Sequence, residues 1–214
     1  MYTLQRNNMQ VATTGVSAIK NQNMHSFSLG DSFDLDDRTF YITEEICMGN
    51  IQDIFQAIIQ INKEDERQEK LFDLDGHIYN RKPITIYVSS YGGSVYDGLA
   101  LIGVMKTSVT PIHTIATGKV MSMGFAITIA GHKRYSTPYT SFMIHSVSSM
   151  AWGQSQDLEE SLDEVRRIEN ILFNLITEKT SITAKFLKKL NKHKRDYYFD
   201  EHKALELGVI SAVV

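Results

Sequence analysis

The chain has 214 residues, of which 43% are hydrophobic and 22% charged, and its formal net charge is −3. This composition is typical of a globular protein, and the mildly acidic balance gives no reason to expect a nucleic-acid partner. A chain of this length can bury one full core, and no long linker rich in proline, glycine and serine divides it.

The single cysteine, Cys47, excludes an intrachain disulfide and a thiolate zinc site, and it favours a reducing compartment. The polar N-terminus has no apolar segment of signal-peptide length, and no apolar run is long enough to span a bilayer. We therefore expect a cytoplasmic protein without a metal or another cofactor.

Residues 1–38 are rich in Asn, Gln, Ser and Thr, which predicts a flexible N-terminal arm before a domain formed by residues 39–214. The domain opens with a strand at 39–43. Apolar residues then recur on one helical face over 48–62. The charged stretch 63–82 is interpreted as an exposed connection.

Two strand–turn–helix units follow. The β-branched run 84–89 predicts a strand buried on both faces, followed by a glycine turn and a helix. The run 112–117 repeats the pattern, with a turn at Gly118 and a helix over about 121–130. With a further strand at 141–145, this alternation predicts an α/β fold with a mostly parallel sheet.

The last third of the chain is predicted to be mainly helical. A polar loop at 146–156 precedes an amphipathic helix of more than twenty residues, whose length indicates that it projects to meet another copy of the chain. A basic helix at 184–192, an extended segment at 197–199 and a short helix at 201–207 follow.

Ser122 lies where a strand gives way to an apolar helical run. The first N–H groups of a helix have no partner inside it, and the helix dipole favours negative charge there, so this serine lies beside an oxyanion site. A serine in this position more commonly serves only as the helix N-cap. Both roles remain open for Ser122 from this pattern alone.

His145 is the histidine best placed to serve such a nucleophile, because it ends an apolar strand and the functional crevice of an open α/β sheet lies at the carboxyl ends of its strands. A purely structural histidine is the alternative. Gly92-Gly93 also follows a buried strand, without a nucleotide-binding motif. The N–H groups of Gly93 and Met123 can then face one point as oxyanion donors, unless the glycines form only a tight turn.

Six motifs in order carry a family resemblance: Ser89-Ser90-Tyr91-Gly92-Gly93, Met121-Ser122-Met123-Gly124, Met143-Ile144-His145, Gly153-Gln154-Ser155-Gln156-Asp157-Leu158, Arg195-Asp196 and Ala204-Leu205-Glu206-Leu207-Gly208-Val209-Ile210. Over residues 39–210 the chain resembles the Clp protease proteolytic subunit family, ClpP. The resemblance implies a ClpP/crotonase-like fold of repeated ββα units with a mostly parallel sheet and a projecting handle helix.

The resemblance also implies roles for single residues. Ser122 matches the nucleophile, His145 the general base and Asp196 the carboxylate that orients the base, while Gly93 and Met123 match the oxyanion donors. A substrate-pairing strand is implied at Ser149, Met150, Ala151, Trp152, Gly153 and Gln154.

The activity implied is that of an ATP-dependent-type serine endopeptidase, which hydrolyses peptide bonds in unfolded polypeptides inside an oligomeric chamber. One or two heptameric rings of identical chains and a docked AAA+ unfoldase are implied as partners, and an isolated subunit is expected to have a poorly aligned triad.

This sequence departs from the family pattern in several places. Tyr91 stands where the family usually has proline, and Ser146-Val147 replaces its Gln-Pro. Lys194 occupies a usually acidic position, and the stretch 63–82 is longer than the family's connection. These departures favour a divergent viral or accessory member of the family.

Two other functions are compatible with the same fold. A catalytically silent ring or scaffold subunit is one, although such paralogues generally lack a triad residue. A crotonase-type acyl-CoA enzyme is the other, because that fold also uses paired N–H groups as an oxyanion hole, but its enolate chemistry does not need Ser, His and Asp together.

Overall fold

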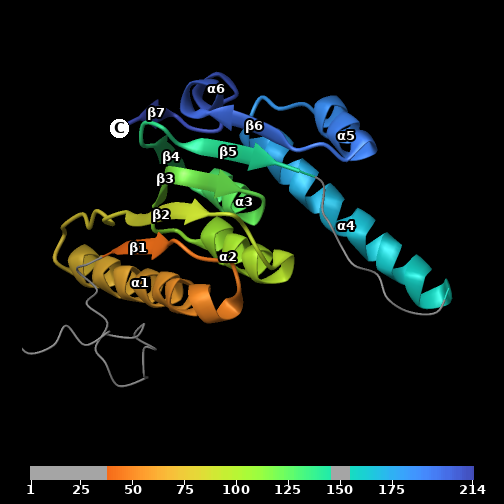
Figure 1. Cartoon of the computed structure of the whole chain (residues 1–214). Coiled ribbons are helices and arrows are strands. Elements are labelled where there is room, and N and C mark those ends of the chain that lie inside the picture. Colours follow the sequence, from red (N-terminus) through yellow and green to blue (C-terminus); the bar gives the residue numbers. More distant parts are fainter. Residues whose placement is uncertain (1–37, 146–154) are drawn as a thin grey trace, which may run out of the picture. The chain divides into compact units, whose positions relative to one another are not determined.

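A mixed β-sheet organises the part of the chain that the computed structural model describes, residues 38–145 and 155–214 (Figure 1). Its strand order is β1-β2-β3-β4-β7, and β5 pairs with both β3 and β6. All pairs are parallel except β5 with β6. The strands are β1 (Thr39–Ile42), β2 (Ile84–Ser90), β3 (Ile112–Met121), β4 (Lys133–Ser136), β5 (Ser141–Ile144), β6 (Tyr197–Asp200) and β7 (Ala212–Val213).

The helices pack around this sheet. Every residue of α3 is buried, as its uniformly apolar sequence predicts. In Figure 1 the N-terminal part of α4 extends away from the sheet. The helices are α1 (Met48–Leu74), α2 (Val95–Thr107), α3 (Met123–Ala130), α4 (Ser155–Lys179), α5 (Ala184–His193) and α6 (Glu201–Glu206).

These elements confirm the predicted α/β class, the mostly parallel sheet and the projecting helix. The predicted arm, residues 1–38, lies outside the described residues apart from Arg38. None of the helices within the described ranges has the length and hydropathy needed to cross a bilayer.

Strand β3 is longer than predicted. It continues through Gly118, which has φ 62°, instead of turning there. Its first half lies between β2 and β4, and after Gly118 it pairs with β5, with a register shift against β2 between Val88 and Ser90. The glycine therefore redirects the strand, and the turn expected at Gly118 was wrong.

Helix α1 also extends beyond its predicted end, because residues 63–74 are helical and not an exposed connection. Ion pairs at helical spacing support this polar part of the helix, from Arg67 to Glu64 and from Lys70 to Glu66. The prediction of an exposed connection rested on the charge of this stretch. Most of the charged residues instead lie on a solvent-exposed face of the helix.

A buried carboxylate attaches the extension to the domain. Asp65 has no exposed surface, and its oxygens accept hydrogen bonds from Arg38 at 2.7 and 2.9 Å, Thr110 at 2.6 Å and Tyr79 at 2.8 Å. Burial alone would raise the pKa of Asp65, but these donors outweigh it and lower the pKa below its ordinary value.

Asp65→Asn is expected to lower the free energy of unfolding at neutral pH by about 3 kcal/mol, because it removes the charge that pairs with Arg38. A depressed folded-state pKa stabilises the fold above the unfolded-state value and loses its effect as pH falls through the folded-state value. The difference in thermal midpoint between wild type and variant should therefore shrink below about pH 4. The exposed Asp73 on the same helix provides a control, since Asp73→Asn should leave the midpoint unchanged.

Candidate active site

Ser122 connects β3 to α3 with an unusual backbone conformation. Its φ of 52° and ψ of −122° place a residue with a side chain in a region that favours glycine. Its N–H donates to the carbonyl of Met143 at 3.0 Å, and its carbonyl accepts from Ala126 N–H at 3.2 Å. Backbone strain of this kind costs about 1–3 kcal/mol and concentrates at functional sites.

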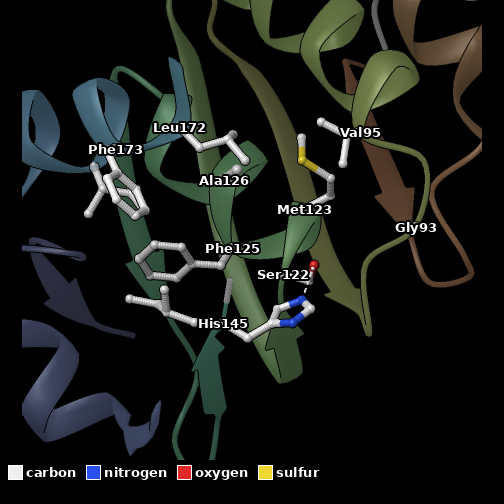
Figure 2. A pocket seen from close by; sticks show the side chains of 11 residues that line it. Gly93, Val95, Ser122, Met123, Phe125, Ala126, His145, Leu172 and Phe173 are labelled. Carbon is white, nitrogen blue, oxygen red and sulfur yellow. Dashed lines mark hydrogen bonds between the residues drawn. The ribbon is translucent and has the colours of Figure 1, made fainter. Parts of the chain in front are cut away.

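The Ser122 side chain faces His145 instead of capping the helix. Ser122 occupies the N-cap position of α3, but its hydroxyl makes no capping hydrogen bond. Its Oγ lies 2.8 Å from Nε2 of His145, as the dashed line in Figure 2 shows. The geometry therefore favours a nucleophile and its base over the capping alternative.

Strand pairing explains why these two side chains meet. Met121 in β3 is paired with Met143 in β5. Ser122 is the first residue after Met121, and His145 is the second residue after Met143. Because parallel strands end at the same edge of the sheet, both side chains emerge there.

Two of the described histidines, His113 and His132, have structural contacts. Burial lowers the pKa of His113, whose ring packs edge-on against Tyr135, and it also lowers the pKa of His132. The Nδ1 atom of His132 accepts a hydrogen bond from Ile112 N–H at 2.9 Å. Neither histidine is hydrogen-bonded to Ser122.

The Gly92–Gly93 turn packs directly against Ser122. A Cβ atom on Gly92 would lie 2.7 Å from Cβ and 3.1 Å from Oγ of Ser122, and 3.1 Å from the nitrogen of Met123. Such distances leave no room for a side chain, and Gly92 has φ 110°. The glycine therefore lets two backbone segments approach at the nucleophile.

Hydrogen bonding among the described residues leaves two backbone N–H groups at the site unused. The parallel bridge between Ile46 and Gly93 uses Ile46 N–H with Gly92 O at 2.8 Å and Ser94 N–H with Ile46 O at 2.6 Å, and so does not use the N–H of Gly93. Met123 is the first residue of α3, where an N–H has no partner inside the helix. Both residues line the same cavity.

A cavity of about 100 Å³ opens beside Ser122 and His145. Figure 2 shows apolar side chains from three helices around it, with Val95 from α2, Phe125 and Ala126 from α3, and Leu172 and Phe173 from α4. Ile144 and Ile176 complete the apolar wall. The cavity can accept an apolar side chain next to the hydroxyl of Ser122.

The contribution of α4 to this wall was not predicted. The sequence predicts an amphipathic helix that includes Leu172, and the length of this helix indicates only that it projects to meet another chain. Apolar residues at helical spacing are buried both in a cavity wall and in an interface between chains, so the spacing alone could not distinguish the two.

Asp196 lies directly before β6 and is exposed. The last antiparallel pair of β5 and β6 joins Ile144 to Tyr197, so the next positions along the two segments are His145 and Asp196. The side chains of His145 and Asp196 make no hydrogen bond with each other in this structure. The topology thus brings the two segments together, but it does not join the carboxylate to the imidazole.

The predicted substrate strand, from Ser149 to Gln154, lies outside the described residues. Within residues 38–145 and 155–214, no group of three or more His, Cys, Asp or Glu side chains could hold a metal ion.

A serine–histidine pair at the carboxyl edge of an α/β sheet, beside an apolar cavity, is an arrangement typical of serine hydrolases. A family model described as Clp protease matches residues 35–214. The chain therefore belongs to the Clp protease family.

Individual relatives agree with this assignment. The ATP-dependent Clp protease proteolytic subunit of Deinococcus radiodurans is 34% identical over 61% of this chain and 64% of its own length, so the match spans less than two thirds of that protein. Proteolytic subunit 1 of Prochlorococcus marinus is 29% identical over 84% of this chain and 85% of that protein.

The fold also matches a solved structure. A variant of ClpP1 from Listeria monocytogenes superposes with a TM-score of 0.68 at 24% identity, and the match covers 84% of this chain and 92% of that one. The ClpP fold predicted from the sequence is confirmed.

Gly92→Ala is expected to displace Ser122 and to slow its labelling by a fluorophosphonate probe by about 100-fold, since misplacement by an ångström has effects of that size. A control is Gly103→Ala in α2, where an added Cβ meets nothing within 4 Å. Equal labelling of the Gly92 variant and wild type, with both folded by circular dichroism, would contradict the close packing described above.

Proposed function

We propose that the protein is a serine endopeptidase of the Clp type, with Ser122 as nucleophile and His145 as general base. The observation that carries the proposal is the 2.8 Å contact between Ser122 Oγ and His145 Nε2, made by a serine with strained backbone. Membership of the Clp protease family supports the same chemistry.

The proposed reaction has two halves. His145 takes the hydroxyl proton while Ser122 Oγ attacks the peptide carbonyl carbon, and the resulting oxyanion is stabilised by the N–H groups of Gly93 and Met123. The intermediate collapses as His145 gives the proton to the leaving amine. Water, deprotonated by His145, then hydrolyses the acyl-enzyme and releases Ser122.

Asp196 is proposed to orient His145 through its ring N–H. Its position opposite His145, next to the Ile144–Tyr197 pair, supports this role, and its exposure in the single chain leaves it free to adjust. We propose that contacts between chains bring the carboxylate to the imidazole, so that the complete triad forms only in the assembled protein.

The cavity is proposed to bind the side chain of the substrate residue that precedes the scissile bond. Its walls are apolar, so burial of an apolar substrate side chain there is favourable by about 25 cal/mol per Å² of apolar surface removed from water. A charged side chain at this position would be desolvated without a partner. We propose that cleavage follows apolar residues.

The natural substrates are proposed to be unfolded polypeptides. Main-chain pairing along Ser149–Gln154 would bind any extended segment, whatever its sequence. A homo-oligomeric chamber of one or two heptameric rings in the cytoplasm, fed by an AAA+ unfoldase, would restrict access to that strand. The domain is proposed to span residues 39–214.

The two other functions fit the site less well. A silent scaffold subunit does not require the strained conformation of Ser122 or its contact with His145. A crotonase-type enzyme would use the two N–H groups, but it has no use for a hydroxyl hydrogen-bonded to a histidine. Thioester turnover without peptide cleavage would favour the latter.

Ser122→Ala should reduce cleavage of a small fluorogenic peptide by at least about 10³-fold, because it removes the nucleophile. The assay is run on an assembled sample, with mass photometry to test for seven or fourteen copies. Ser94→Ala, which removes a nearby helix-capping hydroxyl, serves as the matched serine variant. Undiminished cleavage by the Ser122 variant would exclude the assignment.

Leu172→Gln should lower kcat/KM by about tenfold for a peptide with leucine before the scissile bond, because it places an amide in the cavity wall. The matched variant Ile171→Gln changes the neighbouring α4 residue, which is exposed and does not line the cavity. Equal effects of the two variants would show that the cavity does not hold the substrate side chain.

A further inference from the structure

A lysine and a tyrosine form a pair close to Ser122 that the proposed reaction does not use. The ammonium group of Lys119 lies over the ring of Tyr91, 4.9 Å from its centroid. A cation held against an aromatic face keeps most of its charge available to a further partner.

The positions of the two residues follow from the strands that carry them. Ser90 and Val120 are register partners on β2 and β3, and both are fully buried. Because successive residues of a strand face opposite sides, Lys119 lies on the face opposite to Val120, and Tyr91 follows directly after the end of β2. Tyr91 is 70% exposed, so this face is open to solvent there.

The pair is also close to the nucleophile along both segments. Tyr91 directly precedes Gly92, which packs against Ser122, and Lys119 lies three residues before Ser122. The apolar cavity is lined by side chains from α2, α3 and α4 together with Ile144, and neither Tyr91 nor Lys119 lines it. Ser122 thus lines the apolar cavity and is separated in sequence from the cationic Lys119 by only two residues.

The charge of Lys119 has no acidic partner in the described part of the chain. None of the ion pairs among residues 38–145 and 160–214 includes it, so no carboxylate of these residues lies within 4.0 Å of its ammonium group. Lys70 on α1 and Lys106 on α2 do have such partners, Glu66 and Glu178.

We infer that Tyr91 and Lys119 form a subsite for a carboxylate of the substrate on the leaving-group side of the scissile bond. The inference rests on the proposed peptidase function. With the residue before the bond in the apolar cavity, the chain beyond the bond continues over the opposite face, where the ammonium meets an acidic side chain or a terminal carboxylate and Tyr91 contacts the adjoining apolar atoms.

The test compares internally quenched peptides that share an apolar residue before the scissile bond and differ only after it, with Glu, Gln or Lys. Wild type should cleave the Glu peptide with a kcat/KM about threefold above that of the Gln peptide at low salt, a preference that screening by salt should reduce. Mass spectrometry of the products fixes the cleaved bond. Two further peptides, ending in a free carboxylate or an amide shortly after the bond, separate the two sources of the carboxylate.

Lys119→Gln should bring the Glu-to-Gln ratio to one, and Lys119→Glu should favour the Lys peptide. Lys133→Gln, the same change on β4, should keep the wild-type ratio. If wild type cleaves the Glu and Gln peptides equally well, or if Lys119→Gln keeps the wild-type Glu-to-Gln ratio of kcat/KM, the subsite is excluded while the peptidase function stands. If none of the peptides is cleaved and Ser122 is not labelled by a fluorophosphonate, both the subsite and the proposed peptidase function are excluded.

Discussion

The packing of Gly92 against Ser122 is the constraint on which the site depends. A side chain at Gly92 would overlap the Cβ of Ser122, so β2 and β3 can end at this distance only with glycine there. The same approach places the N–H of Gly93 and the start of α3 beside one hydroxyl. The positive φ of Ser122 is held by hydrogen bonds on both sides, to Met143 and from Ala126, and by the buried helix that follows.

Much of this arrangement was readable from the sequence. Buried strands are continuous β-branched runs, and α3 is apolar on all sides, so the elements that deliver Ser122 and His145 are marked by composition alone. The parallel order of the strands then places both residues at one edge. The proposed oxyanion donors Gly93 and Met123 also follow from their positions at a glycine turn and a helix start, whereas the role proposed for Asp196 came from the family motifs alone.

The remaining features depend on contacts between distant residues. The charge of 63–74 resembles that of a loop, and only the burial of Asp65 against Arg38, Tyr79 and Thr110 shows why it is a helix. The continuation of β3 past Gly118 requires β5 as a new partner, which no local pattern encodes. The hydrogen bond between Ser122 and His145 likewise belongs to the tertiary structure.

Helix α4 belongs to two regions of the molecule. Leu172, Phe173 and Ile176 form a wall of the cavity, while the N-terminal part of the helix extends beyond the sheet (Figure 1). Side-chain contacts hold it laterally to α2, including Tyr96 with Glu164 at 2.9 Å and Lys106 with Glu178 at 3.2 Å. Because a helix is stiff, a tilt imposed on its distant end would also move the residues that line the cavity. Any contact at that end would therefore change the shape of the proposed substrate pocket beside Ser122.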